Sequence, residues 1–376
     1  MDYRLAVYDR VFASCVRERN SGDDSMAVLF RIAFFGVVTL AVFGGAAWYV
    51  NRPAAPEEEA AGGLPVAEEA EVVSEGGPAF VRDFGEAMPS SLSLPEFAEK
   101  EFVGSDFQVG RVLEDNVAYA RHYITYKSNG LKISGIMNVP KGVGPFPLLL
   151  LNHGYIDPAI YTNGRGLKRE QDYLARQGYV VVHSDYRNHA ESDKDPAADS
   201  QFRFGYAEDV INAIQAIKVA DLPYVDAERV GMLGHSMGGG VAWRIAVTQP
   251  GLVDAYVQFA PVSADERDNF DKWIRRRQET AQAILDEHGE PSVNPEFWDN
   301  ISPLTFFENV SSPVLIHHGT ADDSVPLKWS ERAAQELTAQ GKDVTLHVYP
   351  GEPHEFIHAW GQVMQRTTAF FDEHVK

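Results

Sequence analysis

The sequence is poor in two chemical groups, thiols and positive charges. Its 376 residues contain one cysteine, Cys15, which excludes a framework of intrachain disulfides and leaves residues 118–376 without a thiol that could mispair in an oxidising compartment. Lysine and arginine number 33 against 54 aspartates and glutamates, which gives a formal net charge of -21 at pH 7. This excess of negative charge disfavours nucleic-acid binding and electrostatic docking on an anionic membrane.

One long apolar stretch, residues 26–50, stands near the N-terminus. It contains a single charged side chain, Arg31, and is about long enough to cross a bilayer as a helix. Trp48 and Tyr49 would lie at one membrane interface, and the Arg31 side chain could extend to the other. We therefore predict a transmembrane signal-anchor helix that precedes the folded domain.

The residues on either side of this stretch indicate its orientation. Arginines are denser before the end of this stretch (Arg10, Arg17, Arg19 and Arg31) than just after it (Arg52), so the N-terminus (residues 1–25) is predicted to face the cytoplasm and the remainder to lie outside the cell membrane. Two alternatives remain open. A cleavable signal peptide would use the small residues Gly45-Ala46-Ala47, although the long polar start argues against it, and a buried helix would also explain the apolar composition.

Two segments join the apolar stretch to the rest of the chain. Residues 51–77 are rich in Pro, Ala, Gly and Glu, a composition that cannot bury enough apolar surface to fold and that predicts a flexible acidic linker. Residues 78–117 are predicted to form an extension that packs on the domain, with a helix beginning near Ser93. Its candidate packing residues are apolar: Phe97, Phe102, Val103 and Phe107.

Strand and helix patterns alternate from residue 119 onward. Residues 119–126 and 131–139 flank Ser128-Asn129-Gly130, which predicts a β-hairpin. The later apolar runs are separated by helical patterns, which indicates a mostly parallel sheet covered on both faces. The expected strands are 148–151, 179–184, 230–233, 255–259, 313–318 and 344–349, and the expected helices include 166–178 and 201–220. In such an α/β fold the site lies at the carboxyl ends of the strands.

The predicted chemistry centres on Gly234-His235-Ser236-Met237-Gly238. An apolar run ends in this glycine-flanked serine, and a helical pattern of small residues follows it. That order is typical of a nucleophile elbow, in which the serine projects from a tight turn and the glycines let the strand and the helix crowd together. The backbone N–H of Met237, at the start of the following helix, would face a developing oxyanion.

A serine nucleophile on such an elbow needs an acid and then a histidine further along the chain. One predicted strand ends shortly before Asp322 and Asp323, and another ends shortly before His354. Ser236 would attack, His354 would take and return its proton, and one aspartate would orient the imidazole. Asp322 is preferred and Asp323 is the alternative, because spacing alone does not separate adjacent residues.

Four segments together resemble the prolyl oligopeptidase family of α/β-hydrolases. In the family's order they are residues 151–155 (Leu-Asn-His-Gly-Tyr), 234–239 (Gly-His-Ser-Met-Gly-Gly), 318–326 (His-Gly-Thr-Ala-Asp-Asp-Ser-Val-Pro) and 349–356 (Tyr-Pro-Gly-Glu-Pro-His-Glu-Phe). The resemblance extends from about residue 119 to the end of the sequence. It implies an α/β-hydrolase catalytic domain over residues 118–376, with no β-propeller preceding it.

The same resemblance implies the site. Ser236, Asp322 and His354 would be the catalytic triad, and the backbone N–H of Tyr155 would join that of Met237 in the oxyanion hole. The reaction would be hydrolysis of a small ester or peptide through an acyl-enzyme, with a prolyl-oligopeptidase-like peptidase as first choice and a carboxylesterase as second. No cofactor or metal is implied.

The sequence departs from the family pattern in two places. Asn188 and Ala190 stand where relatives usually carry glycines, although asparagine tolerates a left-handed backbone. No counterpart is found of the paired glutamates with which dipeptidyl relatives hold a substrate amine, so peptidase activity follows from the family resemblance more than from a specificity residue.

Residues 263–312 interrupt the alternation with an insertion of helical character. In hydrolases of this type such a segment is usually a small lid or part of the substrate wall. Trp273, Phe297 and Trp298 are candidates to line that wall, and packing within the insertion is the alternative.

A rival motif overlaps the predicted histidine. Residues 354–358 (His-Glu-Phe-Ile-His) match the His-Glu-x-x-His pattern of zinc proteases, which places two imidazoles on one helix face. Gly351 and Pro353 precede the motif and weaken its helix, Glu373 is a poor candidate for a third ligand, and His358 is predicted to be an ordinary helix residue. An inactive binding domain with a hydrolase fold is the third possibility. Four other histidines are predicted either to be structural or to support the site residues, and no metal-ligand cluster is predicted among them: His183, His189, His235 and His317.

Overall fold

The computed structural model describes residues 92–376. The predicted cytoplasmic segment, transmembrane helix and acidic linker, and the first part of the predicted extension, lie outside the described residues. Within residues 92–376, no helix is both long enough and apolar enough to cross a membrane.

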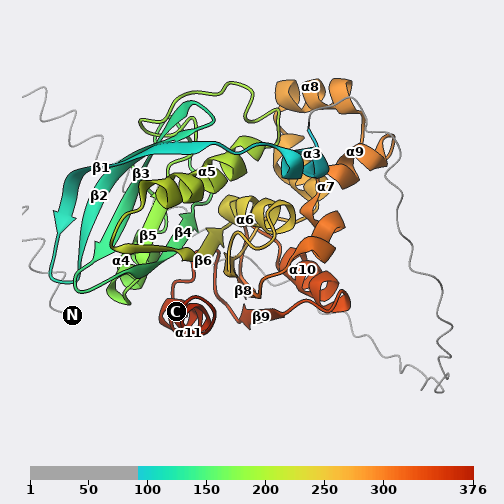
Figure 1. Ribbon diagram of the computed structural model, residues 1–376. Helices are drawn as coiled ribbons and strands as arrows, with labels where there is room; N and C mark the ends of the chain where they lie inside the picture. The colour runs from blue at the N-terminus through green and yellow to red at the C-terminus, as the bar shows by residue number, and fades with distance from the viewer. Residues whose placement is uncertain (1–91) are drawn as a thin grey trace, which may run out of the picture. The chain divides into compact units, whose positions relative to one another are not determined.

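Nine strands of the described residues form one sheet, in the spatial order β1-β2-β3-β5-β4-β6-β7-β8-β9 (Figure 1). The strands are β1 (Gly104–Asp115), β2 (Tyr119–Ser128), β3 (Leu131–Pro140), β4 (Phe146–Asn152), β5 (Val180–Ser184), β6 (Val225–His235), β7 (Ala255–Phe259), β8 (Val314–Gly319) and β9 (Val344–Tyr349). Pairing is antiparallel from β1 to β5 and parallel from β5 to β9. This arrangement confirms the predicted mostly parallel α/β sheet.

Helices cover both faces of the sheet. The helices of the described residues are α3 (Leu94–Glu99), α4 (Lys168–Arg176), α5 (Phe204–Ala220), α6 (Met237–Thr248), α7 (Glu266–Asn269), the π-helix η2 (Phe270–Ile274), α8 (Gln278–His288), α9 (Pro295–Asn300), the 3-10 helix η3 (Pro303–Asn309), α10 (Leu327–Ala339) and α11 (Trp360–His374). Side chains alternate along β4, so Leu148 and Leu150 join the core beneath α5, α6 and α10, while Leu149 and Leu151 join the core beneath α4 and α11.

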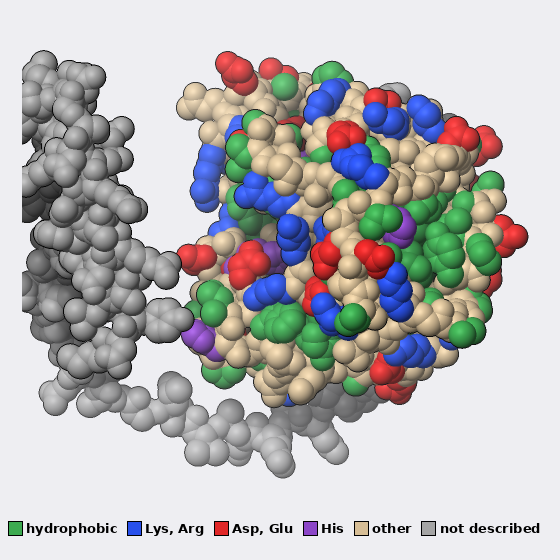
Figure 2. Space-filling view, turned by 90° about the vertical axis from the view of Figure 1, so that its left-hand side faces the viewer, with side chains coloured by type: hydrophobic (Ala, Val, Ile, Leu, Met, Phe, Trp, Pro, Cys, Tyr) green, Lys and Arg blue, Asp and Glu red, His purple; other side chains and the backbone are tan. Residues whose placement is uncertain are grey.

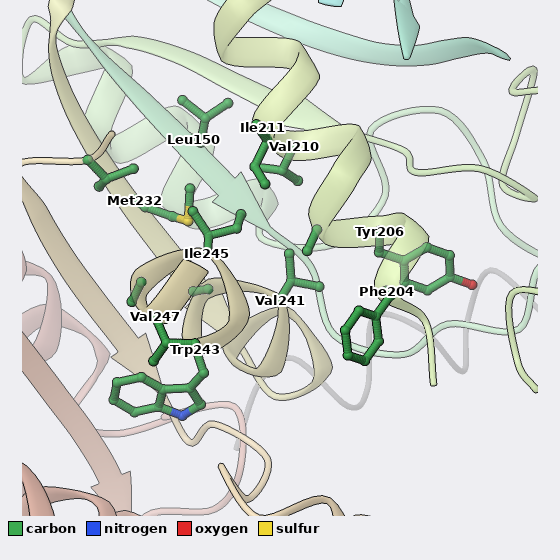
Figure 3. Close-up of a cluster of buried hydrophobic side chains, with 14 of the residues drawn as sticks. Leu150, Phe204, Tyr206, Val210, Ile211, Met232, Val241, Trp243, Ile245 and Val247 are labelled. Atoms are coloured by element: carbon green, nitrogen blue, oxygen red, sulfur yellow. The ribbon is translucent and has the colours of Figure 1, made fainter. Parts of the chain in front are cut away.

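The larger core holds the nucleophile helix in place (Figure 3). Val210 and Ile211 of α5 and Ile245 of α6 lie near Leu150 of β4 and Met232 of β6 in this cluster, and all five side chains are buried. Each such burial stabilises the fold by about 1.5–3 kcal/mol. The start of α6, where the predicted nucleophile lies, is therefore fixed by packing on two strands and one helix.

The predicted hairpin forms between β2 and β3. Asn129 and Gly130 both have positive φ, 45° and 91°, as a tight hairpin turn with a right-handed twist requires. Ser93 caps α3 by accepting the N–H of Glu96, in agreement with the predicted helix start. Of the four candidate packing residues, Phe97, Phe102 and Phe107 contact the core, whereas Val103 is 48% exposed.

Strand β1 was not predicted from the sequence. It adds to the sheet as an edge strand, and Arg111 and Asp115 on it pair with Glu191 (3.9 Å) and Lys141 (2.6 Å). On the side of the molecule where Figure 1 labels β1, Lys and Arg side chains lie among Asp and Glu side chains (Figure 2). Charged side chains on an edge strand disfavour pairing with another sheet.

Candidate active site

Ser236 lies in the turn between β6 and α6. Its backbone is strained, with φ 56° and ψ -119°, values that non-glycine residues rarely adopt. The flanking glycines are required by space: a Cβ on Gly234 would press on the Gly238 carbonyl, and a Cβ on Gly238 would overlap the carbonyl of Asn152. The geometry is that of the predicted elbow, with the serine presented at the carboxyl end of the parallel strands.

Asp322 and His354 meet beyond the ends of β8 and β9. His354 donates from Nδ1 to Oδ2 of Asp322 at 2.7 Å. The other carboxylate oxygen, Oδ1, accepts the backbone N–H groups of Ser324 at 2.9 Å and Val325 at 2.8 Å. Asp323 is exposed, and its carboxylate accepts the Ser324 hydroxyl instead. Of the two adjacent candidates, it is Asp322 that contacts the histidine.

Hydrogen bonds keep the Asp322 carboxylate ionised. Burial alone would raise its pKa, but hydrogen bonds from His318, His354 and the Val325 N–H more than offset that effect and lower the pKa of Asp322 below its ordinary value. A buried carboxylate that stays negative can orient an imidazole through Nδ1–H and stabilise its protonated form.

Sequence reasoning missed the contribution of His318. This buried side chain lies at the end of β8, with Nε2 3.3 Å from Oδ2 of Asp322 and donating to the Val325 carbonyl at 3.0 Å. Its Nδ1 accepts the Ser330 hydroxyl at 2.7 Å, which fixes the ring. His318 begins one of the four segments that resemble the family, but its contact with Asp322 depends on how the following turn folds back.

One pocket of about 500 Å³ connects the predicted site residues. Ser236, Met237, His354 and Tyr155 all line it. A Cβ on Gly154 would lie 3.1 Å from Cβ of Ser236, so the loop that leads to Tyr155 runs directly beside the elbow. The structure therefore brings the predicted nucleophile, base, acid and both predicted oxyanion donors to one end of the sheet.

The loop that carries Tyr155 is held by a buried histidine. The ring of His153 stacks on Tyr186, with 4.4 Å between ring centroids. Burial, and then the nearby His189, lower the pKa of His153 to about 3, so the ring remains neutral near pH 7. A neutral, stacked imidazole packs without a charge partner and can fix the backbone that follows it.

The two residues that stand where relatives usually carry glycines fit the observed backbone. Asn188 and Ala190 both adopt left-handed conformations, with φ 73° and 45°. The Asn188 side chain closes the loop by donating to the Asp195 carbonyl at 2.8 Å and accepting the Asp195 N–H at 2.7 Å. Asparagine thus compensates at its position for the missing glycine, whereas Ala190 carries the cost of a left-handed residue, about 1–2 kcal/mol.

The zinc motif does not form a helix. Residues 354–358 lie in turns, and α11 begins only at Trp360, so the two histidines lack the one-face helical spacing that the motif needs. The prediction of His358 as a helix residue is therefore wrong, because the chain after Pro353 continues through turns that place His354 next to Asp322 instead. The His358 backbone N–H donates to Glu352 at 2.9 Å.

His235, beside the nucleophile, contacts the predicted base. Its Nε2 donates to the His354 carbonyl at 3.3 Å, and the two ring centroids are 4.5 Å apart. Burial, and then the charge of a protonated His354, lower the pKa of His235 to about 3. Ligand atoms of His235, His354 and Glu355 lie within 4.8 Å of one another, a cluster that includes a histidine predicted to be structural. The hydrogen bond to the His354 carbonyl gives His235 a role in holding that loop.

Of the three aromatic candidates in the insertion, one reaches the pocket. Trp273 lines it from η2. Phe297 and Trp298 are buried in the larger core, and Nε1 of Trp298 donates to the Gly289 carbonyl at 3.1 Å. The insertion therefore forms part of the pocket wall through α7, η2 and the start of α8.

Sheet order and elbow define an α/β-hydrolase fold, and solved structures share it. The acylaminoacyl peptidase of Pyrococcus horikoshii superposes with a TM-score of 0.56 at 22% identity, covering 69% of this chain and 42% of that one. Acetyl xylan esterase 1 from Thermoanaerobacterium sp. superposes with a TM-score of 0.55 at 21% identity, covering 72% and 88%. At these sequence identities, the superpositions establish the fold alone.

Residues 166–376, more than half of the chain, match the prolyl oligopeptidase family, and the chain belongs to this family. It is similar to two Bacillus subtilis proteins named as uncharacterized peptidases. YuxL is 26% identical over 310 residues, covering 74% of this chain and 42% of YuxL, and YtmA is 25% identical over 241 residues, covering 62% of this chain and 85% of YtmA. The chain thus spans less than half the length of YuxL. Family membership confirms the resemblance seen in the sequence.

Proposed function

We propose that the protein hydrolyses an ester or peptide bond through a Ser236–His354–Asp322 triad. The observation that carries this proposal is the 2.7 Å hydrogen bond from His354 to a buried Asp322, with Ser236 and His354 lining the same pocket. His354 takes the Ser236 proton as Oγ attacks the carbonyl, then gives it to the leaving group as the acyl-enzyme forms. A water molecule then gives a proton to His354 as it attacks the acyl-enzyme. His354 returns that proton to Oγ of Ser236 as the acid leaves.

The developing oxyanion would lie between the backbone N–H groups of Met237 and Tyr155. Met237 is the first residue of α6, where the helix leaves its N–H groups free and the helix dipole favours negative charge. Support for Tyr155 comes from the close approach of its loop to the elbow. Each such donor stabilises the transition state by about 3–4 kcal/mol.

Peptide hydrolysis is the first choice of reaction, since the chain belongs to a peptidase family. Carboxylester hydrolysis is the second, and the pocket gives it specific support. Three carboxylates line the pocket, but Asp199 and Glu266 form ion pairs with arginines. Of the three, Glu355 is therefore the carboxylate that could bind a substrate amine. A pair of free carboxylates to hold a substrate's N-terminal amine is therefore lacking among the described residues of the pocket. Substrates without a free amine fit this wall better.

A fluorophosphonate probe tests the mechanism directly. The probe should label the wild type and fail to label Ser236→Ala, with no effect of a zinc chelator in either case, because the probe reacts only with an activated serine. The chelator distinguishes this mechanism from the zinc-protease alternative. A zinc protease would not be labelled by the probe, and the chelator would abolish its proteolysis. Folded wild-type protein that neither reacts with the probe nor cleaves any substrate would contradict the proposal and favour an inactive binding domain.

We also propose that residues 26–50 anchor the protein in the cell membrane, with the N-terminus in the cytoplasm and the hydrolase domain outside. Support comes from the apolar sequence and the distribution of arginines. Deletion of residues 1–52 should yield a protein that remains in the supernatant without detergent and keeps the hydrolysis rate of the detergent-extracted full chain. Full-length protein that partitions into the supernatant without detergent would contradict the anchor.

A further inference from the structure

The pocket wall is rich in positive charge, in contrast to the chain's net charge of -21. Four arginines line it: Arg203, Arg244, Arg276 and Arg277. One of them is neutralised within the fold, because Nη2 of Arg244 lies 2.5 Å from Oε1 of Glu266 and both side chains are buried. The other three belong to the start of α5 and to the loop between η2 and α8, two segments that are distant in sequence.

Two of these three arginines share one carboxylate. Oδ1 of Asp199 accepts Nε of Arg203 at 2.9 Å, and Oδ2 of the same residue accepts Nη1 of Arg277 at 3.4 Å. Arg276 forms no ion pair with any residue that the structure describes. Four guanidinium groups therefore face three carboxylates in the wall, those of Asp199, Glu266 and Glu355. The wall keeps an excess of positive charge, within a pocket where part of the solvent is excluded.

The excess charge lies beside the reacting groups. Nη1 of Arg203 is 3.3 Å from Sδ of Met237, the residue after the nucleophile. The guanidinium carbons of Arg203 and Arg277 lie 5.2 Å and 5.7 Å from the ring centroid of Tyr155. Both residues whose N–H groups are proposed to hold the oxyanion thus carry side chains that contact this arginine cluster.

The backbone at Arg203 is also strained. Phe202 and Arg203 adopt left-handed conformations, with φ 49° and 59°, immediately before α5. Consecutive left-handed non-glycine residues persist only where the surroundings hold them, and such positions gather at functional sites. Here the strained turn places both side chains in the pocket wall.

We propose that the substrate carries a carboxylate close to its scissile bond, and that Arg203, Arg276 and Arg277 bind it. The planar guanidinium fork matches the two oxygens of a carboxylate, and such charged pairs are stronger than neutral hydrogen bonds. This inference rests on the proposed hydrolase function and narrows its substrate class to acidic esters or peptides. The anion lies either in the acyl group or in the leaving group.

Two matched pairs of esters test this inference and locate the anion. For the acyl side the pair is 4-nitrophenyl butyrate and mono-4-nitrophenyl succinate, and for the leaving-group side it is phenyl acetate and 3-acetoxybenzoate. In one pair, the acidic member should have at least a tenfold higher kcat/KM than the neutral member. Raising the ionic strength should reduce this ratio, because salt screens partly exposed charges.

The double variant Arg276→Gln/Arg277→Gln should lower the acidic-to-neutral ratio about tenfold or more, mainly through a higher KM for the acidic ester. Arg275→Gln is the matched control. Arg275 lies in the same loop but pairs with Asp271 and Glu290 outside the pocket, so its removal should leave the ratio unchanged. Both replaced side chains in the double variant are exposed, so the fold should tolerate their loss.

Three outcomes would overturn the inference: no acidic preference in either pair, a preference that survives the double variant, or an equal loss in Arg275→Gln. Ser236-dependent hydrolysis of the neutral esters would show that the hydrolase function holds even if the acidic preference is absent. Failure of all four esters together with failure of fluorophosphonate labelling would overturn the proposed function, and the carboxylate site with it.

Discussion

Ser236→Ala and His354→Ala are each expected to lower kcat by roughly 10⁵- to 10⁶-fold, and the double variant is expected to be no worse than either single variant. The reason is that nucleophile and base act as one unit: a serine without its base is not activated, and a base without its serine has no proton to move. The residual rate should come from the oxyanion donors and from substrate binding. Initial rates on a chromogenic ester measure all three variants.

A further variant separates loss of chemistry from loss of fold. Ser236 has φ 56° and ψ -119°, so its backbone is strained whichever L-residue occupies the position. Ser236→Gly should therefore be more stable than Ser236→Ala by about 1 kcal/mol in urea unfolding, while both remain inactive. Near-normal turnover in folded Ser236→Ala or His354→Ala would contradict the triad.

The sheet could be predicted because its pattern is local. Parallel strands buried on both faces appear as short apolar runs, and each predicted run from 148–151 to 344–349 coincides with a strand of the structure. Strand β1 was missed for the opposite reason. The C-terminal half of β1 is exposed, its sequence is mixed in charge, and its register with β2 shifts three times. The strand therefore lacks the strict alternation that identifies a strand in a sequence.

The site was partly predictable for a similar reason. Ser236, Asp322 and His354 each follow a predicted strand within a recognisable motif, and strand ends meet at one edge of a parallel sheet. The side chains that complete the pocket lack such a signal. Arg203 and Arg277 come from different segments, and both pair with Asp199 and lie near the Tyr155 ring. The contact of His318 with Asp322 depends on a turn that sequence spacing does not specify.

The turns before α11 show why a motif needs its structural context. The zinc pattern in residues 354–358 depends on a helix, whereas the triad histidine needs a loop that can reach the end of β8. Pro353 and Gly351 favour the loop, and Gly351 has φ 74°. Pro353 and Gly351 thus argue against the zinc-binding helix and in favour of a loop that carries the triad histidine.

Comparison of Asp322→Asn with Asp323→Asn is expected to give the sharpest contrast between adjacent residues in the chain. Asp322→Asn should lower kcat/KM by about 10⁴-fold, because an amide beside Nδ1 no longer fixes the productive tautomer of His354 or stabilises its protonated form. Asp323 is exposed, and among the described side chains its carboxylate is hydrogen-bonded only to the Ser324 hydroxyl, so Asp323→Asn should change kcat/KM by less than about threefold.

The asparagine at position 322 retains an oxygen that can accept the N–H groups of Ser324 and Val325, so the turn should keep its shape. Ester turnover and urea unfolding of the two variants therefore distinguish a missing charge from a broken loop. A large rate loss with an almost unchanged free energy of unfolding is expected for Asp322→Asn. Equal losses in both variants, or a larger loss at position 323, would show that the hydrogen bond between His354 and Asp322 does not carry the catalytic role assigned to it, because only Asp322 lies within 2.7 Å of the imidazole.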